Sequence, residues 1–270
     1  MSSVESGLRA INGVNVLPLD GLWEAVSTTP NEEKIKTALG YAGCTFYDED
    51  NRFVESNSIS IVGIGGQPLA HTAESDEVIA NRINQLTGGT REMMASSASL
   101  SYLNNGEKSQ PDLYDTVTGL GHFSIAHTVS ANIMIAGISE GAELELNLQR
   151  DLLHISKVTN ARTNIQTRPP IVVPDKRLLA LARSIEESTA SFTNAAREYN
   201  DPDELEILNG FFPINKATLL MLSGDLSNFR KVVQLRDDRG KEKELRDVAD
   251  KINTQLSTLW PEIFNDKEKQ

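Results

Sequence analysis

The chain has 270 residues, of which 39% are hydrophobic and 24% charged, and its net charge of −12 goes with a pI near 4.9. This acidic balance argues against nonspecific nucleic-acid binding, which needs a basic field, and no apolar run approaches the roughly 18 residues that a membrane helix needs. Cys44 is the only cysteine, which excludes a disulfide framework, a Cys-rich zinc site and a Cys–Cys redox pair within one chain.

The N-terminal part of the chain has a mixed composition with turn signals such as Asp20-Gly21. It begins with neither a basic n-region nor an apolar h-region, so we expect a cytoplasmic protein. A short strand is predicted over residues 58–64, where β-branched side chains precede two glycines. We divide the chain into an extension at 1–60 that packs on the core, a main domain at 61–265 and a frayed tail at 266–270.

The middle of the chain changes its hydrophobic period. Helices are predicted over residues 75–94 and 112–120. From 128 to 137 the apolar side chains recur at every second position, which predicts a half-buried strand. Helical spacing then runs from Leu144 to Ile155, with Ser139 as the N-cap.

Helices are predicted for most of the remaining sequence. Residues 175–199 have the pattern of a long amphipathic helix. Three shorter helical runs are predicted at 213–222, 226–235 and 241–259. These patterns predict one main α+β domain that is rich in helix after residue 139.

Three stretches contain the residue types that carry chemistry. The first, Gly121-His122-Phe123-Ser124, joins a predicted helix to the alternating strand. The second spans residues 149–152 and resumes seven residues later at 160–162. The third spans residues 224–236 and is followed by a helical segment at 244–249.

In order and spacing, these stretches resemble the flavin-dependent thymidylate synthases over roughly residues 95–262. That family has a Gly-His-x-Ser turn before a strand and an Arg-His-Arg signature followed by a Ser and an Arg. Near its C-terminus it has a helix similar to Gly-Asn-Leu-Arg-Asn-Trp-Arg that ends in Leu-Arg. The specificity of the resemblance lies in the order and the distances of the pieces.

The chain departs from the family pattern at several positions. Arg150 occupies the first position of the Arg-His-Arg signature, and Asp151 and Leu152 replace the other two. Asn160 replaces the Ser, whereas the closing Arg is retained as Arg162. Asn209 stands where the family has an Arg before a Leu-Pro pair, and Val158 replaces an acidic residue. The expected Glu-His pair is replaced by His127 and Thr128, or by Ala126 and His127 if the turn is one residue shorter.

The resemblance implies roles for individual residues. Arg236 matches the Arg that favours the negative charge developing on the pyrimidine, which makes it the candidate catalytic residue. The positions that match nucleotide contacts are Asn147, Gln149, Arg150, Asn160, Arg162, Asn209 and Arg236. The positions that match flavin contacts are Ser101, His122, Ser124, Arg150, Asp151, Leu152, Asp225 and Lys231. Alternatively, His122 holds a turn, and Arg230, Lys231 and Arg236 form a solvated helix face.

The resemblance also implies a fold and a reaction. The fold is a twisted, largely antiparallel sheet flanked by helices, assembled as a homotetramer whose active sites form where subunits meet. The reaction is C5 methylation of a uracil nucleotide, with FAD as cofactor and with NADPH and methylenetetrahydrofolate as co-substrates. The altered signature is similar in kind to UMP/dUMP methylases of polyoxin-type nucleoside-antibiotic pathways.

Two further expectations concern what the protein does not do. The four histidines form no pair at metal-binding spacing, so we expect no dedicated metal site, and neither nucleic acid nor membrane is an expected partner. The alternative to an enzyme is a non-catalytic, nucleotide-binding relative of the same fold that acts as an interaction protein.

Overall fold

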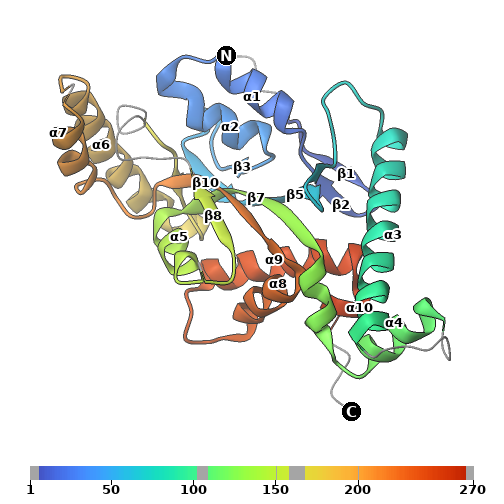
Figure 1. Cartoon of the computed structure of the whole chain (residues 1–270). Helices are drawn as coiled ribbons and strands as arrows, with labels where there is room; N and C mark the ends of the chain where they lie inside the picture. The colour runs from blue at the N-terminus through green and yellow to red at the C-terminus, as the bar shows by residue number, and fades with distance from the viewer. Residues whose placement is uncertain (1–5, 102–108, 150, 158–167, 200, 266–270) are drawn as a thin grey trace.

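The main sheet has seven strands in the part of the chain that the structure describes, in the order β1-β2-β5-β7-β10-β8, with β6 paired to β5. The computed structural model describes residues 6–101, 109–149, 151–157, 168–199 and 201–265 (Figure 1). Every described pairing in this sheet is antiparallel except that of β2 with β5. The strands are β1 (Arg9–Ile11), β2 (Val14–Val16), β5 (Ser58–Ile64), β6 (Gln67–Pro68), β7 (Ser130–Ser139), β8 (His154–Lys157) and β10 (Ala217–Asp225).

A smaller sheet joins the N-terminal region to the middle of the chain. It has the order β3-β4-β9, with β3 (Thr45–Phe46), β4 (Phe53–Ser56) and β9 (Ile171–Val172). The strands β4 and β9 run parallel, with Phe53 opposite Ile171. Together the two sheets and their helices confirm the predicted α+β class.

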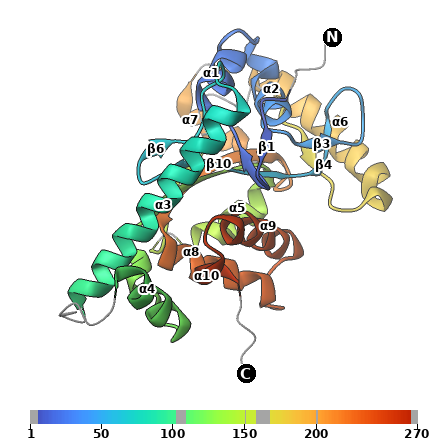
Figure 2. The same ribbon diagram turned by 90° about the vertical axis from the view of Figure 1, so that its right-hand side faces the viewer.

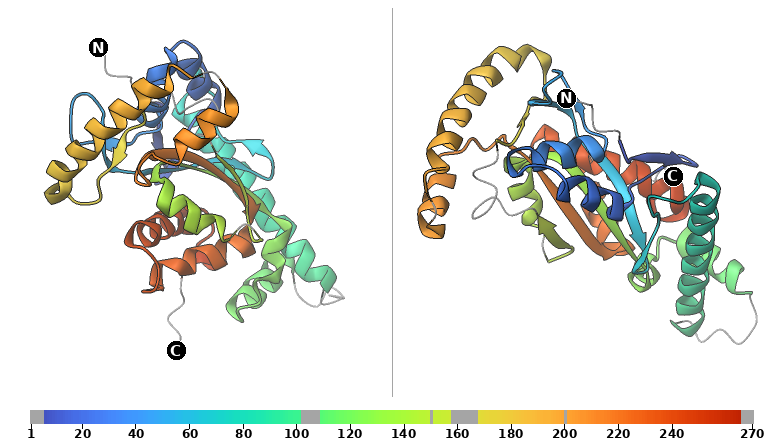
Figure 3. Two further views of the ribbon diagram at one scale, coloured as in Figure 1. Left: turned by 90° about the vertical axis from the view of Figure 1, so that its left-hand side faces the viewer. Right: turned by 90° about the horizontal axis from the view of Figure 1, so that it is seen from above.

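Helices cover both faces of the main sheet (Figures 1 and 2). On one face lie α5 (Glu140–Asn147), α8 (Leu226–Val233), α9 (Lys243–Leu259) and α10 (Pro261–Phe264), and on the other lie α1 (Leu19–Ser27) and α2 (Lys34–Tyr41). The long helix α3 (Asp76–Ser101) runs past the edge of the sheet with α4 (Gln110–Gly119) packed beside its C-terminal half. The helices α6 (Leu179–Ala196) and α7 (Pro202–Asn209) stand away from the sheet (Figure 3). No helix among the described residues is long and apolar enough to cross a membrane.

Alternation along β7 divides the core into two layers. Ile133 and Ile135 are fully buried in the larger core, which α8, α9 and α3 close, whereas Met134 and Ala136 are buried in the core under α1 and α2. The strand predicted over 128–137 is therefore confirmed as β7, but it is not half-buried, because both of its faces are covered from Ile133 onward. Gly137 has a φ of +77°, and a Cβ atom there would lie 2.8 Å from Sγ of Cys44, so a side chain does not fit at this point of the strand.

Two helix predictions are wrong. The helix expected over 144–155 ends at Asn147, and His154–Lys157 forms β8 at the edge of the sheet. Its leucine repeat was misleading because Leu144 and Leu148 are exposed instead of facing the core. The helix expected over 213–222 is largely the central strand β10, whose apolar run is buried on both faces and so has no period of two.

The other predicted elements agree with the structure, with shifts at their ends. The strand at 58–64 is β5, and the helices at 75–94 and 112–120 are α3 and α4. The helix at 175–199 is α6 preceded by a 3₁₀ turn at Lys176–Leu178. The run at 226–235 is α8 followed by the 3₁₀ turn Gln234–Asp237, and 241–259 is α9. Helix α7 was not predicted.

Candidate active site

The first and third chemical stretches meet at the C-terminal end of β10. The Gly121-to-Ser124 turn leads into a 3₁₀ helix, Phe123–Thr128, which packs against α8. Nδ1 of His127 lies 3.0 Å from Oδ1 of Asp225, and the guanidinium carbon of Arg230 lies 4.1 Å from the centre of the Phe123 ring. The backbone N–H of Leu226 donates to the carbonyl of Val129 at 2.9 Å, which fixes the start of α8 against the start of β7.

The second stretch reaches the same place from the other side of β10. Strand β8 pairs with β10, so the turn that precedes β8 lies beside Gly224. A Cβ atom at Gly224 would lie 2.4 Å from Cδ2 of Leu153 and 3.5 Å from the carbonyl oxygen of Leu152. Because Leu153 is buried in the core, glycine at 224 is what lets the two segments approach. The described part of the second stretch, which ends at Leu152, therefore lies at the same end of the sheet as the first stretch and the start of the third.

A chain of polar side chains starts at this point. The carboxylate of Asp225 caps α8 by accepting from the backbone N–H of Asn228 at 2.8 Å, and its other oxygen accepts from the Asn228 amide at 2.8 Å. The ammonium group of Lys231 donates to Oδ1 of Asn228 at 3.2 Å. His127 and Lys231 stand at the two ends of this row of side chains. About half of the His127 side chain is exposed and Lys231 is exposed, so each can donate a hydrogen bond to a bound molecule.

The predicted flavin residues before β7 have local hydrogen bonds. His122 precedes the 3₁₀ helix, and its backbone N–H donates to the carbonyl of Val117 at 3.0 Å, a bond that does not involve the imidazole ring. Its side chain and that of Ser124 are exposed next to His127 in the chain. Ser101, the last residue of α3, donates to the carbonyl of Ser97 at 2.9 Å.

The predicted residues near α5 differ in their surroundings. Asn147 donates to the fully buried carboxylate of Glu143, which also lies 3.0 Å from Nζ of Lys157. Gln149 makes the turn after α5 through its backbone, Asp151 is exposed, and the side chain of Leu152 packs against the core. Arg150, Asn160, Arg162 and the side chain of Asn209 lie outside the described residues.

Arg236 lies at the opposite end of α8. It belongs to the 3₁₀ turn Gln234–Asp237, its side chain is 16% exposed, and its Nε lies 3.6 Å from Oδ2 of Asp237. The eight residues of α8 span about 12 Å at 1.5 Å per residue. In one copy of the chain, the backbones of Asp225 and Arg236 are therefore separated by the length of this helix.

A wide groove borders the convergence point. Its volume is about 740 Å³, and it runs between the middle of α3 and the segment Thr128, Val129 and Ser130. Ser130 stands opposite Asp225 in the β7–β10 register, so the groove ends beside the capped helix. Cβ atoms at Gly88 and Gly89 of α3 would meet no atom within 4 Å, which leaves the helix backbone open toward solvent there. Pockets of roughly 300–1,000 Å³ are typical of cofactor and small-molecule sites.

Sequence reasoning missed several members of this site. His127, Asn228, Glu143 and Lys157 were not assigned roles, although His127 was noted as a departure from the expected Glu-His pair. The contact of His127 with Asp225 depends on the pairing of β7 with β10, which no local pattern reveals. Among the described residues, no group of three or more histidine, cysteine or acidic side chains is arranged to hold a metal ion.

The role of Asp225 in the site can be separated from its role as a helix cap. We expect Asp225→Ala to lower the free energy of unfolding by about 1–2 kcal/mol, because α8 loses its N-cap and His127 loses its partner. Asp225→Asn keeps an acceptor for the cap and should cost clearly less. The matched control is Asp201→Ala, which removes the N-cap of the peripheral helix α7. Urea unfolding measures the loss of free energy of unfolding in both variants. Equal losses for Asp225→Ala and Asp201→Ala would show that the contact of Asp225 with His127 adds no stability beyond the helix cap.

Comparisons with known proteins bear on the family and on the fold. A model of the family described as Thymidylate synthase complementing protein (Thy1) matches residues 69–262. None of the curated proteins compared matches the chain. The structure of Thymidylate Synthase X from Helicobacter pylori with FAD and dUMP aligns at a TM-score of 0.55 and 16% identity, covering 67% of this chain and 95% of that one. The UMP/dUMP methylase PolB from Streptomyces cacaoi, bound with 5-Br dUMP, aligns at 0.55 and 10% identity, covering 79% and 95%.

Proposed function

The chain belongs to the thymidylate synthase complementing protein family, and on that premise we propose that it is an enzyme that methylates C5 of a uracil nucleotide, UMP or dUMP. The observation that carries this proposal is that the first stretch, the start of the third stretch and the described part of the second stretch lie together at the end of β10. Further support comes from the neighbours of this fold, one of which was solved with FAD and dUMP and another of which is a UMP/dUMP methylase. We propose that the enzyme acts in the cytoplasm.

FAD is the proposed cofactor, and the groove of about 740 Å³ beside Thr128, Val129 and Ser130 has a volume typical of cofactor sites. FAD would supply hydride transfer and carry the one-carbon unit from methylenetetrahydrofolate, with NADPH as reductant. His122, Ser124, Asp225 and Lys231 are the proposed contacts among the described residues, together with Ser101, Asp151 and Leu152. Lys231 and the N-terminal end of α8 would favour the negative charge of a phosphate group.

The proposed nucleotide contacts are side chains with guanidinium and amide groups. We propose Arg150, Asn160 and Arg162 for its phosphate, because guanidinium groups bind phosphate oxygens in pairs. Asn147, Gln149 and Asn209 are proposed for the remainder of the nucleotide. Arg236 would stabilise the negative charge that develops on the pyrimidine when C5 becomes nucleophilic.

The distance between Asp225 and Arg236 bears on assembly. Since one copy places them at opposite ends of α8, we propose that each active site combines the Asp225 end of one copy with Arg236 of another. A homotetramer with active sites at subunit contacts satisfies this requirement. Sedimentation or light scattering gives the mass of the assembly.

Flavin binding separates the enzyme from the non-catalytic alternative. We expect the purified protein to bind FAD at micromolar concentration, visible as flavin absorbance or as quenching of flavin fluorescence on titration. Lys231→Met should weaken this binding about tenfold, because it removes one charged donor. Lys243→Met is the matched control, since Lys243 pairs with Asp247 on the exposed side of α9.

The outcome decides between the two functions. A protein that binds UMP or dUMP but no FAD would be the nucleotide-binding interaction protein. If FAD binds, transfer of label from methylenetetrahydrofolate to UMP or dUMP in the presence of NADPH tests the reaction itself and identifies the preferred nucleotide.

A further inference from the structure

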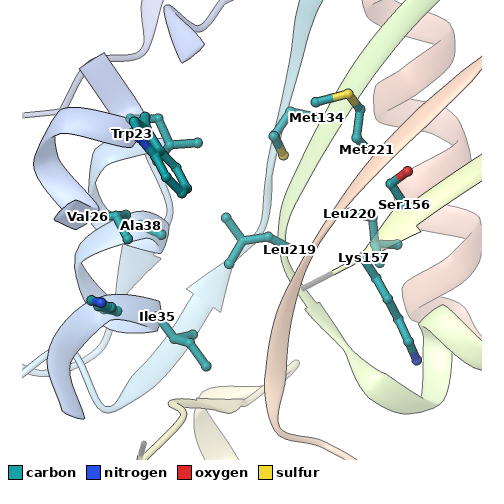
Figure 4. A pocket seen from close by; sticks show the side chains of 12 residues that line it. Trp23, Val26, Ile35, Ala38, Met134, Ser156, Lys157, Leu219, Leu220 and Met221 are labelled. Atoms are coloured by element: carbon teal, nitrogen blue, oxygen red, sulfur yellow. The ribbon is translucent and has the colours of Figure 1, made fainter. Parts of the chain in front are cut away.

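A second cavity lies between the main sheet and the N-terminal helices (Figure 4). Its volume is about 370 Å³, and it is on the face of the sheet opposite α8 and α9. Trp23 and Val26 of α1 and Ile35 of α2 form one wall. The other wall is the sheet. Helices α1 and α2 precede residue 69, so this cavity depends on the part of the chain outside the family match.

The sheet wall is made by side chains that alternate along β10. Leu219 and Met221 pack into the core under α1 and α2, whereas Leu220 and Leu222 pack into the core on the other face. Met134 of β7, which is opposite Met221, completes the wall. Methionine side chains are unbranched and adapt to the shape of what they contact, so this wall suits an apolar ligand.

Helix α1, which packs on the sheet through Leu22 and Val26, is positioned by contacts at its N-terminal end. Asp20 accepts hydrogen bonds from the backbone N–H and the hydroxyl of Thr72 at 3.1–3.3 Å. Gly21 lies against Tyr41, where a Cβ atom would be 2.0 Å from the phenol oxygen. The start of the helix is therefore fixed, and the side chains one turn later stand over the cavity without filling it.

The charges around the cavity are positive. Lys157 contacts its edge, but its ammonium group points away from α1 and α2 and lies 3.0 Å from Glu143 (Figure 4). Lys34, the first residue of α2, is the other charged residue among the described residues that line the cavity. An apolar cavity with a cation at its edge is complementary to an apolar molecule that carries a single negative charge.

We propose that this cavity binds a medium-chain carboxylate, with the chain against Leu219 and Met221 and the carboxylate at Lys34. This site is distinct from the proposed active site, because it lies on the other face of the sheet from α8. Trp23 marks its mouth: the indole lines the cavity and is nevertheless 75% exposed. The second tryptophan, Trp260, is fully buried and donates to Thr90, so Trp23 dominates any change in fluorescence on binding.

The experiment titrates the full-length protein with decanoate, below its micellar concentration, and follows tryptophan emission. We expect a saturable blue shift in the submillimolar range, lost in Trp23→Phe. Decanol, which has the same chain without the charge, should bind about tenfold more weakly, the factor expected from loss of one charged hydrogen bond. Lys34→Met should remove this difference, whereas Lys176→Met, which removes an equal charge from the exposed turn before α6, should preserve it.

Two variants test whether the cavity itself is occupied. Ala38→Phe fills the cavity and should abolish the emission shift. Met221→Gln places an amide in the cavity wall and should weaken binding, and this second variant keeps the test available if Ala38→Phe does not fold. Equal affinity for decanoate and decanol would overturn the assignment of a carboxylate. An emission shift that persists in both cavity variants would overturn the proposal. A shift that depends on protein concentration instead of ligand concentration would also overturn it, and would show that Trp23 lies at a contact between copies of the chain.

Discussion

Replacing Arg236 with lysine is expected to lower turnover about 10²–10³-fold. This is the usual effect of removing one preorganised hydrogen-bond donor that stabilises the negative charge of a transition state. Lysine keeps the positive charge but loses the planar fork that a delocalised anion on the pyrimidine would contact. The affinity for nucleotide should fall much less than the rate, because the interaction is assigned to the transition state. This follows from the proposed function and from the position of Arg236 in a turn held by α8 and α9.

A structural role for Arg236 predicts a different order of losses. Its side chain is only 16% exposed and lies beside Asp237, so it could instead tie the 3₁₀ turn to the fold. In that case Arg236→Lys would lower the melting temperature and the mass of the assembly before it lowered activity. Arg239→Lys, three residues further and fully exposed, is the matched control. A variant that binds flavin and nucleotide and still methylates at the wild-type rate would remove Arg236 from the mechanism.

The parts of the fold that were predictable have a local pattern. Strand β7 was predictable because its first part alternates, with Ser130 and Asn132 more exposed than the buried Ala131 and Ile133, and Ser139 caps α5 as expected by accepting from the backbone N–H of Ala142. Strand β10 lies between β7 and β8 and is apolar toward both faces, so its sequence has no period that distinguishes it from a buried helix. Its assignment required the partner strands, which are 60 or more residues away.

The site follows the same division. The order of the three stretches in the sequence indicated the family, because spacing is a property of the chain. The contact between His127 and Asp225 could not be predicted, since it depends on the β7–β10 register, and the clearance at Gly224 depends on the turn before β8. The separation of Arg236 from Asp225, in contrast, already follows from the helix predicted over 226–235, which is α8 with its 3₁₀ turn.

The N-terminal region is joined to the rest of the molecule through Arg52, which lies just before β4. Its guanidinium donates to Oε1 of Glu186 at 3.0 Å and to the carbonyls of Arg168 at 2.6 Å and Pro169 at 3.4 Å. The side chains of Arg52 and Glu186 are 13% and 9% exposed, and Arg168 also pairs with Glu186. Burial lowers the pKa of Arg52 from its ordinary value, and the neighbouring Glu186 opposes that shift.

This arrangement makes Arg52 a link between three segments of the sequence. The carbonyl of Arg52 also accepts from Ile171 at 2.8 Å, which begins the pairing of β4 with β9. The proposed division of the chain near residue 60 would make the first part an addition to the family domain. Through the contacts of Arg52, that addition nevertheless contributes to the stability of the segment entering α6.

We therefore expect Arg52→Met to lower the free energy of unfolding by about 3 kcal/mol, because removing one partner of a buried ion pair leaves the other charge without compensation. Arg168 remains beside Glu186, which places the effect at the lower end of the usual range of about 3–5 kcal/mol. The free energy of unfolding of Arg52→Lys should lie between those of the wild type and Arg52→Met. Lysine can pair with Glu186 but cannot reach both carbonyls in the same geometry.

The control for Arg52 is Arg177→Met, which breaks an exposed pair with Asp175 and should cost far less than the loss of a buried pair, because water screens the exposed charges. Urea unfolding at one protein concentration measures all three variants, because assembly makes the apparent stability depend on concentration. A loss for Arg52→Met no larger than that for Arg177→Met would show that Arg168 alone satisfies Glu186. The N-terminal region would then be held by β2, β4 and the core under α1 and α2, and not by this ion pair.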